Sequence, residues 1–155
     1  MLNVVYKIGS ACIASRLKRI LPNLIHEDQT GFVQNRYIGD NLRQMYDIIA
    51  YLDEQNLPGM LLNVDFEKAF NWISWDFMFK VLKAYGFRED FVKWIVVFYK
   101  NIRSCVVVNG QVSSWFGIDR GCRQGDPLSP YLFILCAEIL AITVRENRDK
   151  GHKYR

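Results

Sequence analysis

The stretch V-D-F-E-K-A-F-N-W-I-S-W, from Val64 to Trp75, decides how this sequence is interpreted. It continues the apolar run M-L-L-N at residues 60–63, and residues 60–66 together have the length of a strand buried between helices. We therefore expect a strand that delivers Asp65 at its C-terminal end, just before the chain turns into a helix. Catalytic groups are commonly placed at that edge of a sheet.

The chemistry of Asp65 has two readings at this point. Mg²⁺ prefers oxygen ligands, and the Asp65 carboxylate with the backbone carbonyl of Phe66 could supply two of them. An aspartate at a strand end also serves to cap the segment that follows. The residues around Asp65 leave both readings open.

A second stretch, R-G-C-R-Q-G-D-P-L-S-P-Y-L-F, runs from Arg120 to Phe133. Ser129 followed by Pro130 predicts a cap and a first helical position, and the apolar residues beyond them predict a helix to about Val144. Glycines, basic residues and a carboxamide before a helix are suited to binding phosphates and bases. The same composition is also typical of a simple connector from a hairpin to a helix.

The rest of the chain alternates helical patterns with one hairpin. Asn109-Gly110 is a strong hairpin signal, and it predicts strands over 104–108 and 111–118. We interpret the apolar stripes of the helices as core and expect the tail 145–155 to be charged and loose. The other predicted helices cover about 4–21, ending at Pro22; a segment after Asp40 with Leu42, Met45, Ile49 and Leu52 on one face; 75–85, capped by Ser74 and ended by Gly86; and about 91–102.

Composition sets wide bounds. The chain has 155 residues, 50% of them hydrophobic, and a formal net charge of +4, which permits binding to a polyanion without requiring it. No apolar run reaches the roughly 20 residues of a membrane helix, and no secretion signal is recognisable. We expect an intracellular protein of the nucleus or cytoplasm, not secreted and without membrane contact. Its four cysteines should be reduced thiols: Cys12, Cys105, Cys122 and Cys136.

Taken together, these stretches resemble the reverse transcriptases of non-LTR (LINE-type) retrotransposons. The resemblance implies an α+β fold, the fingers and palm portion of a right-hand polymerase, truncated before the third catalytic motif. It divides the chain into fingers at about 1–59 and palm at about 60–155. It rests on four stretches in the family's order: Y-K-I at Tyr6, Q-T-G-F-V-Q-N-R-Y-I-G-D-N at 29–41, D-F-E-K-A-F at 65–70 and R-Q-G-D-P-L-S-P-Y-L-F at 123–133.

The resemblance assigns catalytic and nucleotide-binding roles to the first motif. Asp65 matches the catalytic aspartate that holds two Mg²⁺ ions, with Mn²⁺ as a substitute, and the carbonyl of Phe66 completes its share of the metal ligands. Phe70 matches the bulky residue beneath the nucleotide sugar that excludes a 2′-hydroxyl. A core aromatic residue is the alternative reading of Phe70, and one ring can do both.

The remaining assignments concern the template and the nucleotide. Gln124 and Gly125 match the loop beside the nascent base pair, where the carboxamide binds the nucleotide and glycine allows close backbone approach. Arg36 is assigned either to the template or triphosphate or to an ordinary solvated surface, and the two readings are equal. The implied partners are an RNA template, a DNA primer and a dNTP.

The sequence also departs from the family pattern. Asn71 stands where members usually carry aspartate, and the family's aromatic-Ala-Asp-Asp motif does not occur within the 155 residues. Since two metal ions need several carboxylates, we expect little or no polymerisation from this chain alone. The alternatives are a non-catalytic RNA-binding remnant or domesticated retroelement module, and a remnant that does not fold stably.

Overall fold

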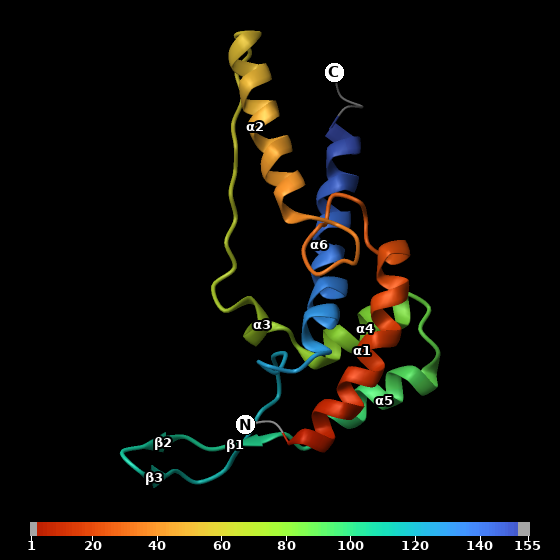
Figure 1. Cartoon of the computed structure of the whole chain (residues 1–155), viewed down its shortest axis with the longest axis vertical. Helices are drawn as coiled ribbons and strands as arrows, with labels where there is room; N and C mark the ends of the chain where they lie inside the picture. Colours follow the sequence, from red (N-terminus) through yellow and green to blue (C-terminus); the bar gives the residue numbers. More distant parts are fainter. Residues whose placement is uncertain (1–2, 152–155) are drawn as a thin grey trace.

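A computed structural model describes residues 3–151, and its centre is a group of four helices: α1 (Val4–Leu24), α4 (Trp75–Ala84), α5 (Glu89–Tyr99) and α6 (Ser129–Gly151) (Figure 1). Apolar residues that recur about one turn apart in these helices pack into one core, as the sequence predicts. The core includes fully buried side chains from all four helices and from the loop before α6: Leu17, Leu21, Met78, Leu82, Ile95, Leu128, Leu132 and Leu135.

Helix α1 begins where predicted and ends later than predicted. Asn3 caps it, because its side chain accepts a hydrogen bond from the N–H of Val5 at 2.9 Å. Pro22 lies inside the last turn instead of ending the helix, which continues to Leu24. A single proline near the C-terminus removes one helical hydrogen bond, and Ile25 still donates to the carbonyl of Leu21 at 3.0 Å.

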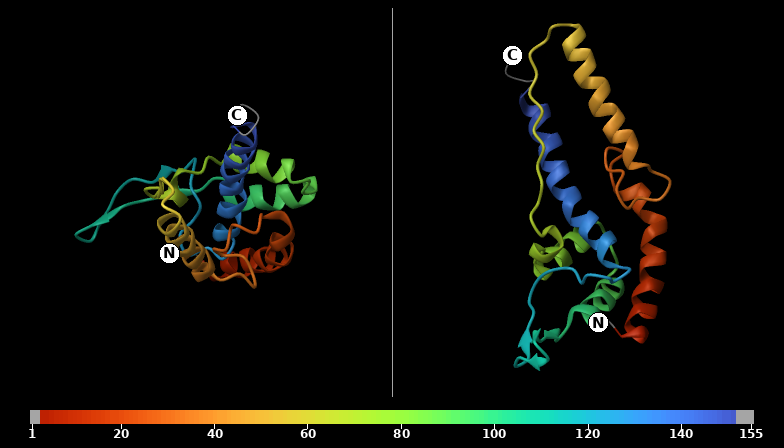
Figure 2. Two further views of the ribbon diagram at one scale, coloured as in Figure 1. Left: turned by 90° about the horizontal axis from the view of Figure 1, so that it is seen from above. Right: turned by 60° about the vertical axis from the view of Figure 1, so that its left-hand side comes forward.

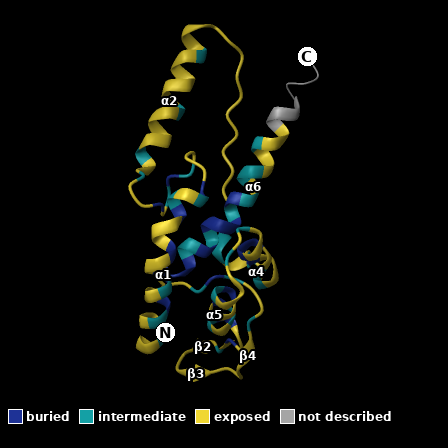
Figure 3. Cartoon of the chain, turned by 90° about the vertical axis from the view of Figure 1, so that its right-hand side faces the viewer, coloured by how far each residue is buried: buried dark blue, intermediate teal, exposed yellow. Residues whose placement is uncertain are grey.

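Helix α2 (Ile38–Glu54) and the extended segment 57–66 form an arm that leaves the helical body and returns to it (Figures 1 and 2). The prediction that Leu42, Met45, Ile49 and Leu52 belong to the core is wrong for this structure, because α2 buries no residue. Figure 3 shows the arm almost entirely exposed. Met45, Ile49 and Leu52 instead line an open hollow of about 1110 Å³ between α2 and the returning segment.

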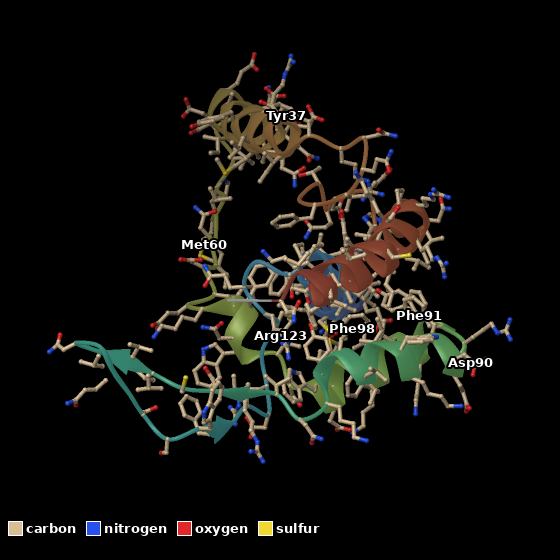
Figure 4. The ribbon with its side chains drawn as sticks, turned by 60° about the horizontal axis from the view of Figure 1, so that its bottom comes forward. Tyr37, Met60, Asp90, Phe91, Phe98 and Arg123 are labelled. Carbon is tan, nitrogen blue, oxygen red and sulfur yellow. The ribbon has the colours of Figure 1, made fainter. Side chains whose placement is uncertain are left out.

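The predicted strand over residues 60–66 is also wrong. The segment is extended, but it pairs with no strand among residues 3–151, and every residue in it is exposed. Met60, at 92% exposure, is the extreme case (Figure 4). A strand is stable only when another strand satisfies its backbone groups, and no local sequence pattern can supply that partner.

Helices α4 and α5 follow the prediction closely. Gly86 has φ of 77° and ends α4, with its N–H donating to Lys83 and that of Phe87 donating to Leu82. Ser74 precedes α4 as predicted, but its side chain makes no capping hydrogen bond. Its backbone forms a β-bridge with Arg120 instead.

The predicted hairpin forms, with Asn109 and Gly110 both at positive φ in its turn. The long strands predicted on either side are broken into two short antiparallel pairs. β2 (Val107–Val108) pairs with β3 (Gln111–Val112), and β1 (Arg103–Ser104) pairs with β4 (Phe116–Gly117). The described fold is therefore mostly helical, with two small sheets in place of one central sheet.

Helix α6 begins at Ser129, one residue before the predicted first helical position at Pro130, and extends past Val144 to Gly151. The loose tail predicted from residue 145 is therefore wrong up to Gly151, and residues 152–155 lie outside the described part of the chain. Between residues 3 and 151 no helix combines the length and the hydropathy that crossing a membrane requires.

Candidate functional site

The two motif stretches lie against each other through their backbones. The N–H of Cys122 donates to the carbonyl of Phe70 at 2.7 Å, and the N–H of Gly121 donates to that of Ile73 at 2.7 Å. The indole N–H of Trp75 donates to the carbonyl of Gly121 at 2.9 Å. These bonds join the short helix α3 (Ala69–Trp72) to the α6 entry loop, residues 120–128, across about fifty residues of sequence.

Glycine is required at residue 121 for two reasons. Its φ is 86°, a conformation that residues with a Cβ rarely adopt, and a Cβ there would lie 3.0 Å from the carbonyl oxygen of Asn71. The close approach of the two motif stretches therefore depends on the missing side chain of Gly121.

A hollow of about 400 Å³ opens where the stretches meet. Phe70 lines it from α3, and Gln124 and Gly125 line it from the α6 entry loop. Gln124 is exposed, and Gly125 has φ of 78°, so the turn presents its backbone and a free carboxamide to solvent. The structure thus brings together three of the residues assigned to the nucleotide, while their roles stay predictions.

Phe70 has one face on the core and lines the hollow as well. Its ring stacks on that of Phe133 in α6, with centroids 4.4 Å apart and an interplanar angle of 20°. The ring is half-buried and packs against the core cluster. This arrangement is compatible with both readings of Phe70, as a packing residue and as a wall of the nucleotide site.

Asp65 is exposed on the extended segment and not at the end of a paired strand. The Phe66 carbonyl assigned to the metal accepts the N–H of Ala69 at 3.2 Å, in the turn that begins α3. Within residues 3–151 no three His, Cys, Asp or Glu side chains converge to hold a cation. The oxygen donors of the described residues therefore do not fit two divalent ions.

Arg36 is bound within the fold. Its two terminal nitrogens donate to four backbone carbonyls, those of Gln29 at 2.8 Å, Pro22 and Ile25 at 3.0 Å, and His26. Two of these carbonyls, at Pro22 and Ile25, belong to the end of α1, where a positive charge is favourable. Neither earlier reading of Arg36 included this structural role, and all four of its terminal N–H groups are engaged in it.

A larger groove of about 780 Å³ adjoins the hollow and shares Asn71, Arg123 and Gln124 with it. Arg103 and Arg120 also line the groove, and no acidic residue does. Trp72 stands beside it, 64% exposed, with the Arg120 guanidinium 5.8 Å from its ring centroid. Arginines and an exposed indole side by side are suited to phosphates and bases.

Asp126 has a structural role in this region that the sequence did not predict. It is 3% exposed and accepts hydrogen bonds from Tyr6 at 2.9 Å, from Ser10, and from the N–H of Leu128 at 3.1 Å. Burial first, and then the Asp126 charge, raise the pKa of Tyr6 well above its ordinary value, so its hydroxyl remains a donor. Asp126, and not Ser129, therefore caps the start of α6, by accepting the buried N–H of Leu128.

A local signal for this role of Asp126 exists. Asp-Pro-Leu-Ser directly before an apolar helix is typical of an aspartate whose side chain binds the N–H two residues on. The partners on α1, Tyr6 and Ser10, are more than a hundred residues away, and no spacing rule connects them.

Comparison with known proteins identifies the family. Residues 1–153 match the family described as reverse transcriptase (RNA-dependent DNA polymerase). The Transposon TX1 uncharacterized 149 kDa protein of Xenopus laevis is 32% identical over 94% of this chain. The retrovirus-related Pol polyprotein from the type-2 retrotransposable element R2DM of Drosophila melanogaster is 30% identical over 75% of it.

A further relative is also a retrotransposon polyprotein. A retrovirus-related Pol polyprotein from the type-1 retrotransposable element R2 of Popillia japonica is 28% identical over 63% of the chain. The match spans 11% of the TX1 protein and 11% of the R2DM polyprotein, so the chain corresponds to a small part of each. The resemblance to non-LTR retrotransposon proteins is confirmed, and the chain belongs to the reverse transcriptase family.

Proposed function

We propose that this chain is part of an RNA-directed DNA polymerase of a non-LTR retrotransposon, with residues 1–59 in the fingers and 60–155 in the palm. In the whole protein it would bind an RNA template, a DNA primer and a dNTP, and it would carry out metal-dependent nucleotidyl transfer. The observation that carries the proposal is the shared hollow of Phe70, Gln124 and Gly125. Its walls come from two stretches held together by backbone hydrogen bonds.

The hollow and the groove are proposed to bind different parts of the substrate, the nucleotide and the nucleic-acid strand. The hollow of about 400 Å³, with Phe70 and Gln124 among its lining residues, is assigned to the incoming nucleotide. The groove continues from it with Arg103, Arg120 and Arg123, which suit the phosphates of a strand. A strand in the groove would therefore bring its end to the nucleotide hollow.

The metal ion proposed for nucleotidyl transfer by the whole protein is Mg²⁺ or Mn²⁺, because reverse transcriptases use divalent ions. Asp65 is the carboxylate assigned to it here, and a complete two-ion site would need further ligands from the whole protein.

The test is binding of an RNA–DNA hybrid at increasing salt. In a variant with Arg103, Arg120 and Arg123 all replaced by glutamine, the slope of log affinity against log salt concentration should become shallower by about three. Each phosphate contact contributes about one to that slope. The matched control removes the same charge from α4 and α5 with Lys80, Lys83 and Lys93 replaced by glutamine. Equal losses in both variants would mean that net charge, and not the groove, binds the hybrid.

A further inference from the structure

The α6 entry loop is held at several points around Gln124 and Gly125. On one side, the backbones of Gly121 and Cys122 are bonded to α3 and its C-terminal neighbour. On the other side, Asp126 is bonded to helix α1. Gln124 and Gly125 are the exposed residues between these anchors.

The α1 side of this arrangement is built by one tyrosine and one serine. The hydroxyl of Tyr6 donates to one carboxylate oxygen of Asp126 at 2.9 Å, and Ser10, fully buried one turn later, donates to the other. The guanidinium of Arg123 lies over the ring of Tyr6, 4.5 Å from its centroid, and the same ring packs edge-on against Phe98.

Tyr6 therefore contacts the loop on both sides of Gln124, through Arg123 before it and through Asp126 after it. Asp126 in turn accepts the N–H of Leu128, and its carbonyl accepts that of Ser129 at 3.2 Å. Asp126 thus links α1 to the start of α6, through its carboxylate to Leu128 and through its carbonyl to Ser129. A buried carboxylate with three donors is a rigid anchor, because removing any donor leaves charge poorly satisfied.

We propose that Tyr6 and Ser10 are positioning residues, which hold Asp126 and thereby fix where Gln124 presents its carboxamide at the nucleotide hollow. The role of Gln124 rests on the proposed function, whereas the ordering of the loop does not. Gln124 lies at the hollow because α1 holds the loop that carries it. Tyr6 also lines the groove, but its hydroxyl is bonded to Asp126, so the loss of that hydroxyl should act on ligand binding through Gln124.

The first measurement is tryptic cleavage after Arg123 in the whole chain, relative to cleavage after Lys100 in the exposed turn beyond α5. Tyr6→Phe removes the hydroxyl and keeps the ring, and it should raise relative cleavage after Arg123 about tenfold. Tyr6→Leu also removes the ring and should raise it further. Tyr85→Phe is the matched control, because it deletes a buried tyrosine hydroxyl that has no hydrogen-bond partner and lies outside the loop.

The second measurement is a double-mutant cycle on affinity for the RNA–DNA hybrid at low salt. Tyr6→Phe should weaken binding about threefold in the natural chain and should have no effect in a Gln124→Ala background. A purely structural role of Tyr6 would give the same loss in both backgrounds and would overturn the proposal. Unchanged cleavage after Arg123 in both Tyr6 variants would overturn it as well.

The two measurements separate the inference from the function on which it rests. If the natural chain does not bind the hybrid, the proposed function fails. The cleavage measurement then still decides whether Tyr6 and Asp126 order the loop.

Discussion

The N–H of Cys122 lies 2.7 Å from the carbonyl oxygen of Phe70, and this bond joins the two stretches that line the hollow of Phe70, Gln124 and Gly125. These backbone atoms take no part in the proposed binding of a nucleotide. Their hydrogen bond sets the distance between the Phe70 ring, which is proposed to contact the sugar, and the Gln124 carboxamide, which is proposed to bind the base. Predictions about this junction therefore test the site more directly than predictions about exposed residues.

Gly121→Ala should lower the free energy of unfolding by about 2 kcal/mol, because it combines a strained φ with a clash against the Asn71 backbone. Gly86→Ala is the control. Gly86 has a similar φ of 77° with nothing within 4 Å of an added Cβ, so it should cost about 1 kcal/mol. Urea unfolding of both variants gives the comparison, and equal costs would show that the α3 junction yields without strain.

Arg36→Ala should cost about 2 kcal/mol of unfolding free energy, because it frees four backbone carbonyls around the end of α1. The control is Arg43→Ala in α2, where the arginine is exposed and its ion pair with Asp47 spans 4.0 Å. That variant should change stability by less than about 0.5 kcal/mol. An Arg36→Ala variant as stable as the natural chain, but with weaker hybrid binding, would favour the template reading.

The cysteines give a test of the core. Cys12 is exposed and should react with a thiol reagent at pH 8, whereas Cys122 and Cys136 should react only after unfolding. Burial raises the pKa of Cys122 to about 11 and that of Cys136 to about 12, so both remain protonated at pH 8. Mass spectrometry of labelled peptides, with and without denaturant, would reveal a loose core if both react rapidly in the folded chain.

The same two thiols predict a loss of stability in alkali. Each has a folded pKa above its ordinary value, so the folded state holds the proton more tightly than the unfolded state. Their stabilising effect is complete below about pH 9 and falls as the pH rises through 11 and 12. Cys136→Ala should reduce the difference in unfolding free energy between pH 8 and pH 10.5, and an unchanged difference would contradict the assignment.

Local chemistry made parts of this fold predictable. Asn109-Gly110 forms its turn and Gly86 ends α4, because each needs only its own backbone preference. The start of α6 at Ser129 follows for the same reason. The sequence also grouped Phe70 with Gln124 and Gly125, although only through the resemblance to a family.

The failures share a different cause. The strand over 60–66 and the buried face of α2 both need partners from elsewhere, and neither a period nor a turn signal shows whether a partner exists. The contacts of Arg36 and of Asp126 were not predicted, because their partners lie at the end of α1 and on its first turns. A charged residue whose contacts are distant in sequence looks the same as one on the surface.

Phe70→Ala should raise ribonucleotide incorporation in a longer form of the chain that extends a primer, since removing the ring opens space for a 2′-hydroxyl. Phe87→Ala is the control. Phe87 is also half-buried, and it stacks on Phe91 at 4.9 Å and 20°, so the control removes a comparable aromatic pair. Selectivity that changes equally in both variants would mean that Phe70 acts only through packing against Phe133.

Residues 1–155 alone should bind an RNA–DNA hybrid and should not extend its primer with Mg²⁺ or Mn²⁺. Binding needs only the arginines of the groove, and these are present and unopposed by acidic lining residues. Extension needs carboxylates gathered around two ions. Asp65 is exposed on an unpaired segment, and Asp126 is buried against α1, so neither can assemble such a site with the other.

The assay is primer extension on an RNA template beside an Asp65→Ala variant, with hybrid binding measured on both. Extension that disappears in Asp65→Ala would contradict the prediction and would identify Asp65 as a working metal ligand. Equal binding by both proteins without extension is the expected result, because Asp65 lines neither the groove nor the hollow.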